Sequence, residues 1–498
     1  MSPKSASMRG ITRYIVFLVG LQLYGAVGAE RALFGHVDEQ DVTSNVWSFA
    51  QLRRAGKLLF DAKFTNEDGA GRPGATGNGS PTQRPIGTEP RFLRTAGPDA
   101  NSCFGCHNDP ASGGAGDFVT NVFAGTPSRE PAILSISPTL VAERGTPSLF
   151  GAGVIEMLAR EMTRDLQGQR SSAIEKAVSE GKPVRLPLVT KGVEFGHIIG
   201  LPDGNVDRTE INGVDKDLVV RPWGQKGVVT SLRTFTNTAM NQHHGMESVE
   251  RFGMNLTGTP DFGGSGVQDA LTVGDITAIT VYQASLPVPG RVLPKDLPLL
   301  TAVATGEKLF TQIGCAECHK PRLPLYTTTY SEPGPYNLEG NLRLTEVVKP
   351  FTFDFLNDMP SPRPEMDATG ILEVHAYTDL KRHVICDRER PFFCNETLVQ
   401  GFVPVDQFIT KRLWEVGNGG PYGHRHDLTT IREAILAHGG EARGARLNFE
   451  DLGEEDRTTV IEFLKTLQTL PESSPPIITK ADAEISSLPY RAIPESTP

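Results

Sequence analysis

After its first 29 residues the chain has no long hydrophobic run, and it is short of positive charge and of cysteine. No later apolar stretch approaches the roughly 20 residues that a membrane-spanning helix needs, so we expect no membrane span. Lysine and arginine number 49 against 59 acidic residues, a net charge of −10. This acidic balance argues against nucleic acid and anionic membranes as partners. The cysteines number six, so the role of each can be considered separately.

Residues 1–29 are predicted to be a secretory signal peptide. Lys4, Arg9 and Arg13 precede an apolar run over residues 14–27, and the small residues Gly28 and Ala29 form a cleavage site. The run is too short and wrongly flanked for a membrane span. Its removal takes away three positive charges, so the mature net charge is −13. No cysteine near the cleavage site could carry a lipid anchor. We therefore expect a soluble periplasmic or secreted protein.

Four cysteines lie in two copies of one motif. Residues 103–107 read Cys-Phe-Gly-Cys-His and residues 315–319 read Cys-Ala-Glu-Cys-His. In such a run each thiol adds across a vinyl group of a porphyrin, and the histidine is the proximal iron ligand. A lone Cys-x-x-Cys would also suit a zinc site or a redox dithiol, but here both copies end in histidine. The motifs predict two covalent c-type haems, held by Cys103, Cys106 and His107 and by Cys315, Cys318 and His319.

The segment before each motif is also repeated. Residues 306–310, Gly-Glu-Lys-Leu-Phe, read as the short amphipathic helix that opens a cytochrome c domain, and residues 56–60, Gly-Lys-Leu-Leu-Phe, repeat the pattern. In the first copy an inserted Gly- and Pro-rich stretch, residues 66–87, lies between this helix and Cys103. Helical periodicity is clearest at residues 51–60, 173–178, 273–283 and 457–467. We predict a mainly α fold with two cytochrome c-like haem domains, long irregular loops and insertions.

The predicted domain boundaries follow the repeat. The signal peptide (1–29) precedes an N-terminal haem domain (30–286), a Pro-rich linker (287–299), a C-terminal haem domain (300–470) and a Pro/Ser-rich tail (471–498). The remaining cysteines, Cys386 and Cys394, are expected to form a structural disulfide in an oxidising compartment. A redox-active pair is the alternative, but the spacing is far from Cys-x-x-Cys.

His438 is the candidate sixth ligand of the second haem. A predicted capping box begins at Thr430, and Ile431, Ala434, Ile435 and His438 fall at i, i+3, i+4 and i+7 of the helix that follows. His438 therefore lies on the apolar face. A histidine there is usually a satisfied core residue, but an iron in need of a ligand favours coordination.

Several segments resemble the di-haem oxidoreductases, a branch of the bacterial di-haem cytochrome c peroxidase superfamily. They are residues 240–247, 271–275, 408–414, 420–424, 428–435 and 438–442, so the resemblance spans most of the mature chain. In the classical peroxidases a methionine stands where this chain has His438; here it is histidine, as in the related rubber oxygenases. A second imidazole lowers the potential of a haem relative to a thioether ligand. The resemblance implies a low-potential, low-spin second haem that passes electrons.

Catalysis is then expected at the first haem, where the candidates for proton transfer to peroxide are Glu156, His243 and His244. The alternatives are a helix cap for Glu156 and exposed loop imidazoles for the two histidines. Trp223 and Trp414 are either electron relays, as a tryptophan is in the superfamily, or core residues. His424 and His426 are expected to orient the second haem or its propionates. The stretch 203–207 could hold the calcium found between domains in relatives, although the complete spacing of a calcium loop is absent.

The leading hypothesis is an enzyme, a peroxidase-like oxidoreductase that reduces hydrogen peroxide or dioxygen at its first haem. Its acidic surface favours a small basic electron-donor protein of the cytochrome c or cupredoxin type. Two alternatives remain open: a haem-dependent oxygenase of the rubber-oxygenase type, and a pure electron-transfer cytochrome in which both irons have six ligands.

Overall fold

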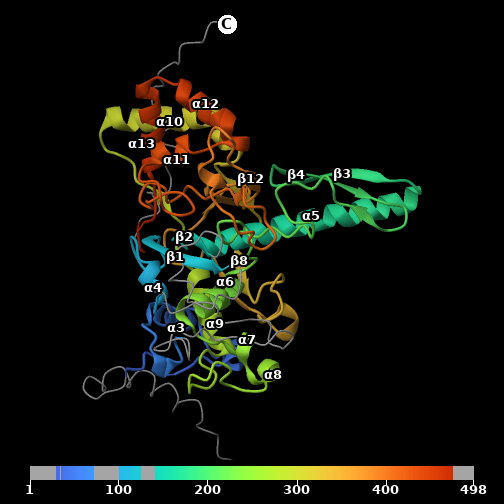
Figure 1. Cartoon of the computed structure of the whole chain (residues 1–498), viewed down its shortest axis with the longest axis vertical. Coiled ribbons are helices and arrows are strands. Elements are labelled where there is room, and N and C mark those ends of the chain that lie inside the picture. Colours follow the sequence, from blue (N-terminus) through green and yellow to red (C-terminus); the bar gives the residue numbers. More distant parts are fainter. Residues whose placement is uncertain (1–29, 34, 72–99, 125–140, 471, 475–498) are drawn as a thin grey trace, which may run out of the picture.

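The computed structural model describes residues 30–33, 35–71, 100–124, 141–470 and 472–474 (Figure 1). The predicted signal peptide, most of the tail and part of the inserted stretch lie outside the described residues. Among the described residues, no helix combines the length and the apolar character needed to cross a membrane.

The fold is not mainly α. Of the described residues about 36% are helical and about 16% lie in strands, which form several small sheets. The helices are α2 Glu39–Thr43, α3 Phe49–Asp61, α4 Cys103–Cys106, α5 Ala152–Glu180, α6 Leu232–Ala239, α7 Val249–Phe252, α8 Met254–Thr257, α9 Val273–Ala284, α10 Leu297–Gln312, α11 Ile431–Leu436, α12 Arg443–Asp451 and α13 Glu454–Lys465.

The sheets have two or three antiparallel strands each, and they form in segments that the sequence reading treated as irregular loops. The strands are β1 Gly116–Ala124, β2 Val141–Thr146, β3 Val184–Thr190, β4 Val193–Gly200, β5 Val206–Asp207, β6 Gly290–Arg291, β7 Leu323–Leu325, β8 Thr329–Glu332, β9 Phe351–Asp354, β10 Glu365–Met366, β11 Leu372–Val374, β12 Arg382–Val384, β13 Gln407–Ile409 and β14 Leu467–Gln468.

The hairpin of β3 and β4 shows why the prediction of a mainly α fold was wrong. Thr190 pairs with Val193, and the two residues between them, Lys191 and Gly192, have φ of 50° and 75°. A two-residue loop with positive φ is the favoured hairpin turn. With α5 this hairpin forms the arm that projects from the body in Figure 1.

Each half of the chain contains one pair of crossing helices, and a glycine makes each close approach possible. A Cβ on Gly56 of α3 would lie 1.9 Å from the carbonyl oxygen of Ala278 in α9. A Cβ on Gly306 of α10 would lie 1.9 Å from the carbonyl oxygen of Thr459 in α13. Figure 1 shows the two pairs at opposite ends of the molecule. The repeat seen in the sequence is therefore a repeat of tertiary structure.

Gly306→Ala should lower the free energy of unfolding by about 1–3 kcal/mol, because the new methyl group meets backbone that cannot move aside. The matched control is Gly168→Ala in α5, where an added Cβ meets nothing within 4 Å. That change should stabilise the protein by about 0.5–1 kcal/mol. Denaturant unfolding followed by circular dichroism measures both; destabilisation of similar size in the two variants would contradict the close contact of α10 with α13.

Aromatic rings extend each helix pair toward its Cys-x-x-Cys-His motif. The Phe60 ring centroid lies 5.2 Å from Tyr282 and 6.2 Å from His107. In the second half the Phe310 ring lies 5.4 Å from Phe463 and 6.4 Å from His319. Both predicted proximal histidines thus lie against equivalent phenylalanines.

A loop of identical backbone shape precedes α6 and α11. Trp223 forms a bridge with Val229 in the first, and Tyr422 forms a bridge with Leu428 in the second. The residue after each aromatic ring is a glycine with φ near 80°, and the fourth residue after the ring again has positive φ. Each loop ends in a hydroxyl that caps the helix, so the repeat includes the segments that lead to His244 and His438.

The main hydrophobic core does not follow the predicted domain boundary. Residues from the region 323–380, among them Tyr330, Phe353 and Leu372, belong to the same buried cluster as Leu52 and Ile279. The region 300–470 therefore contributes both to its own smaller core around Phe310 and Phe463 and to the N-terminal one. The division into domains stays a prediction.

Candidate haem sites

The second Cys-x-x-Cys-His motif opens into a cavity of about 450 Å³, within the range of about 300–1,000 Å³ that is typical of cofactor pockets. Cys315, Cys318, His319 and His438 all line it. The predicted capping box at Thr430 is present, and α11 ends two residues before His438. The fold therefore brings together all four residues that the sequence assigned to the second haem.

Two of the histidines that line this cavity, His319 and His438, form hydrogen bonds through Nδ1, as metal-binding histidines commonly do. The His319 Nδ1 lies 3.0 Å from the Tyr377 carbonyl oxygen, and the His438 Nδ1 lies 2.7 Å from that of Ala434. A hydrogen bond donated from Nδ1 leaves Nε2 unprotonated and fixes the ring. Burial, with the neighbouring His438, lowers the pKa of His319 to about 4, and burial lowers the pKa of His438. Both imidazoles are therefore neutral and able to bind a metal.

Basic side chains line the same cavity. Burial, with the nearby Arg412, lowers the pKa of Lys411 to about 7, and burial also lowers the pKa of Arg412. Within the described residues neither side chain forms an ion pair, although Arg412 donates to the Ser148 carbonyl oxygen. Glu415 lines the same cavity and its charge acts on both side chains. Two buried basic groups with a single nearby carboxylate suit the two propionates of a haem. No role was predicted for Lys411 and Arg412 from the sequence. Two adjacent basic residues inside a largely apolar segment could nevertheless have indicated a buried site for an anionic group.

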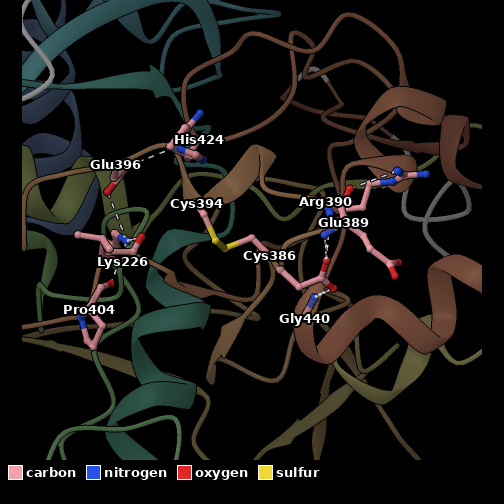
Figure 2. Close-up of a disulfide and its surroundings, with 12 residues drawn as sticks. Lys226, Cys386, Glu389, Arg390, Cys394, Glu396, Pro404, His424 and Gly440 are labelled. Atoms are coloured by element: carbon pink, nitrogen blue, oxygen red, sulfur yellow. Dashed lines mark hydrogen bonds and ion pairs between the residues drawn. A yellow bond between two sulfur atoms is a disulfide. The ribbon is translucent and has the colours of Figure 1, made fainter.

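The Cys386–Cys394 disulfide is present, as predicted, and its loop contacts Gly440, two residues after His438 (Figure 2). The Gly439 N–H donates to the Ile385 carbonyl oxygen and the Gly440 N–H donates to Asp387, each at 2.8 Å. The Phe393 ring lies 5.6 Å from the His438 ring. The disulfide loop therefore packs against the candidate ligand His438 and against the two glycines that follow it.

Removing this disulfide with the paired change Cys386→Ala and Cys394→Ala should loosen His438. We expect a loss of stability of at most about 3 kcal/mol, since the closed loop is short, together with a weaker low-spin ferric signal of the second haem. Urea unfolding and EPR of the same preparation measure the two effects. A variant with unchanged stability and a full low-spin signal would show that the loop has no such role.

At the first motif, the structure brings both predicted distal histidines close to Cys103 and His107. The His107 Nδ1 lies 3.2 Å from the Gly114 carbonyl oxygen, and burial, with nearby His243 and His244, lowers its pKa to about 4. The His244 Nε2 lies 3.5 Å from the Cys103 sulfur. His244 is only 3% exposed, so the alternative of an exposed loop imidazole does not hold for it.

His244 has the same local setting as His438. Its Nδ1 lies 2.6 Å from the Ala100 carbonyl oxygen, as the His438 Nδ1 lies 2.7 Å from that of Ala434. A glycine follows each histidine, and a helix with a hydroxyl cap precedes each. In the first half a π-helical turn, Met240–His244, extends that helix. These features fit His244 as a sixth ligand.

Glu156 lies in a different setting from the one the sequence reading expected. It is fully buried in α5, where one carboxylate oxygen pairs with Arg160 at 2.5 Å. The other accepts from the Leu232 N–H, at the start of α6, at 2.7 Å. Both oxygens are therefore engaged, which favours the helix-cap alternative; a role in proton transfer stays a prediction.

The two tryptophans are core residues that border the second site without lining its cavity. The Trp414 ring lies against Gly151, and the Arg412 guanidinium lies 5.3 Å from the Trp223 ring centroid. His424 and His426 do line the cavity, as their predicted role requires.

The structure gives no support to calcium at residues 203–207. The carboxylates of Asp203 and Asp207 accept from the N–H groups of Asn205 and Thr209 within their own turns. Over the described ranges, three or more potential metal-binding side chains converge only at Cys318, Asp379 and His383. There the His383 ring lies between the carboxylates of Asp379 and Glu441, 2.8 Å from each.

Comparison with known proteins adds little. No model of a protein family matches the chain, and no curated protein matches it. Among solved structures, a chain of hydrazine synthase from Kuenenia stuttgartiensis, determined under 20 bar of xenon, is 13% identical with a TM-score of 0.36. The match covers 94% of this chain and 100% of that one. A likeness of this size supports no inference about function.

Proposed function

We propose that the protein is an exported di-haem c-type cytochrome oxidoreductase. The observation that carries the proposal is the pair His319 and His438, which line one cavity with two cysteines and with Lys411 and Arg412. Such a site suits a covalent haem with two imidazole ligands, closed to substrate and of low potential. Electrons from a small donor protein enter there and pass to the site of His107.

At the first site we propose reduction of peroxide, as in the cytochrome c peroxidases that the sequence resembles. A bound haem supplies the redox chemistry at this site. His107 holds the proximal position, and its Nδ1 contact with Gly114 orients the ring. His243, whose ring lies 6.5 Å from that of His244, is assigned to hold a proton taken from the peroxide.

A pure electron-transfer cytochrome is the second candidate. The equivalence of His244 with His438 favours it, because a histidine on each side of both irons leaves no position for a substrate. Under this candidate both haems are low-spin.

Mass spectrometry and EPR of the purified oxidised protein separate these candidates. Two covalent haems per chain, with one high-spin and one low-spin ferric signal, support the peroxidase. Two low-spin signals that persist on partial reduction and addition of peroxide support the carrier. A chain with no covalent haem would overturn both.

A further inference from the structure

The two candidate haem sites share one wall, the segment 114–116 at the start of β1. Ala115 lines the cavity of the second site. The residue before it, Gly114, contributes the carbonyl oxygen that contacts the His107 Nδ1. The residue after it, Gly116, lies so close to Cys106 that an added Cβ would be 2.0 Å from the carbonyl oxygen of that cysteine. Three consecutive residues thus separate the two sites.

His426 reaches this wall from the second site. Its ring lines the cavity and lies on Gly145 of β2, where an added Cβ would be 1.8 Å from the ring. β2 pairs with β1 in register Gly116 to Thr146, so Gly145 lies beside the segment 114–116 at the same end of one hairpin. The imidazole therefore connects the cavity to the residues that contact His107.

The backbone of His426 is held in a conformation that favours glycine. Its φ is 55°, whereas the equivalent position of the first loop is Gly227 with φ of 62°. A non-glycine residue in this region costs roughly 1–2 kcal/mol. Glycine would make the same turn without that cost, and the imidazole adds a ring that packs on Gly145.

We propose that His426 and the segment 114–116 are the path by which electrons cross from the second haem site to the first. Each crossing moves one electron, and no bond forms or breaks. Electron transfer is faster through bonded and hydrogen-bonded atoms than through gaps. This path needs one through-space step, from the His426 ring to Gly145, before the paired strands β2 and β1 lead to Gly114 and the His107 Nδ1. Trp223 and Trp414 lie outside the cavity lining and are not part of it. The inference rests on the proposed function.

The test is the rate of electron exchange between the two haems after rapid partial reduction, followed optically. His426→Gly and His426→Asn both accept the left-handed backbone, and both remove the ring. Each should keep two covalent haems, because the cysteines of both motifs are untouched, and slow the exchange at least tenfold. Trp414→Phe, the control, should change the rate less than twofold.

An unchanged rate in both His426 variants would overturn the path, as would a tenfold slower rate in Trp414→Phe alone. These outcomes leave the proposed function standing, because both haems remain present. A wild-type protein without two haems would instead overturn the proposed function and the path together.

Discussion

His438→Ala should abolish the low-spin ferric signal of the second haem. The variant removes the imidazole that lines the cavity together with His319 and whose Nδ1 is held by the Ala434 carbonyl oxygen. His438→Met should keep a low-spin haem and raise its midpoint potential, since a thioether stabilises the reduced iron relative to an imidazole. EPR and a spectroelectrochemical titration measure the two effects. Peroxide turnover should fall at least tenfold in the alanine variant.

His375→Ala is the control for this prediction. His375 is part-exposed, pairs with Glu373 and does not line the cavity. Its removal should therefore leave the low-spin ferric signal and the midpoint potential of the second haem unchanged. If His438→Ala retained the low-spin signal at full intensity, the sixth ligand of the second haem would have to be another group.

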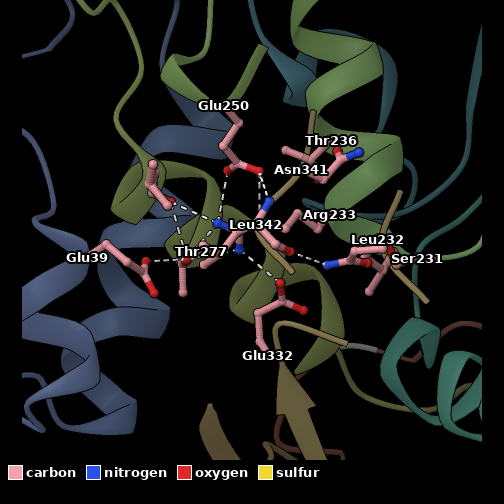
Figure 3. A network of polar contacts seen from close by, with 12 residues as sticks. Glu39, Ser231, Leu232, Arg233, Thr236, Glu250, Thr277, Glu332, Asn341 and Leu342 are labelled. Carbon is pink, nitrogen blue, oxygen red and sulfur yellow. Dashed lines mark hydrogen bonds and ion pairs between the residues drawn. The ribbon is translucent and has the colours of Figure 1, made fainter. Parts of the chain in front are cut away.

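Arg233→Met should lower the free energy of unfolding by about 3–5 kcal/mol, because it leaves buried carboxylates without their cation. Figure 3 shows Arg233 at the centre of a buried polar network. Its guanidinium pairs with Glu250 at 2.9 Å and with Glu332 at 2.8 Å, and all three side chains are at most 3% exposed. Burial also raises the pKa of the neighbouring Glu39 to about 7. The network joins α2, α6, α7 and β8.

The matched control for Arg233→Met is Arg343→Met. Arg343 pairs with Glu346 at the surface, where half of its side chain is exposed. Such pairs contribute little, so denaturant unfolding should show no measurable change. Equal destabilisation by the two variants would mean that the buried network does not hold these elements together.

The sequence alone was sufficient to predict the features that depend on residues close together in the chain. The Cys-x-x-Cys-His runs, the capping box at Thr430 and the pairing of Cys386 with Cys394 could all be predicted, because each needs a fixed short spacing. The helices expected at residues 51–60 and 273–283 form as α3 and α9. The fold class could not be predicted, because short strands such as β8 and β9 become ordered only when they pair and pack into the core.

The sequence by itself determined which residues form the two predicted attachment motifs and that His438 lies at the helical spacing of Ile431, Ala434 and Ile435, since those properties depend on residue order alone. Only the tertiary structure decided what surrounds them. Glu156 reaches Leu232 across 76 positions, Arg412 contacts Ser148 across 264, and His426 lies on Gly145. Burial, local charge and side-chain contact are properties of a packed interior. Packing brings together segments that lie far apart in the chain, and their spacing in the sequence does not predict these contacts.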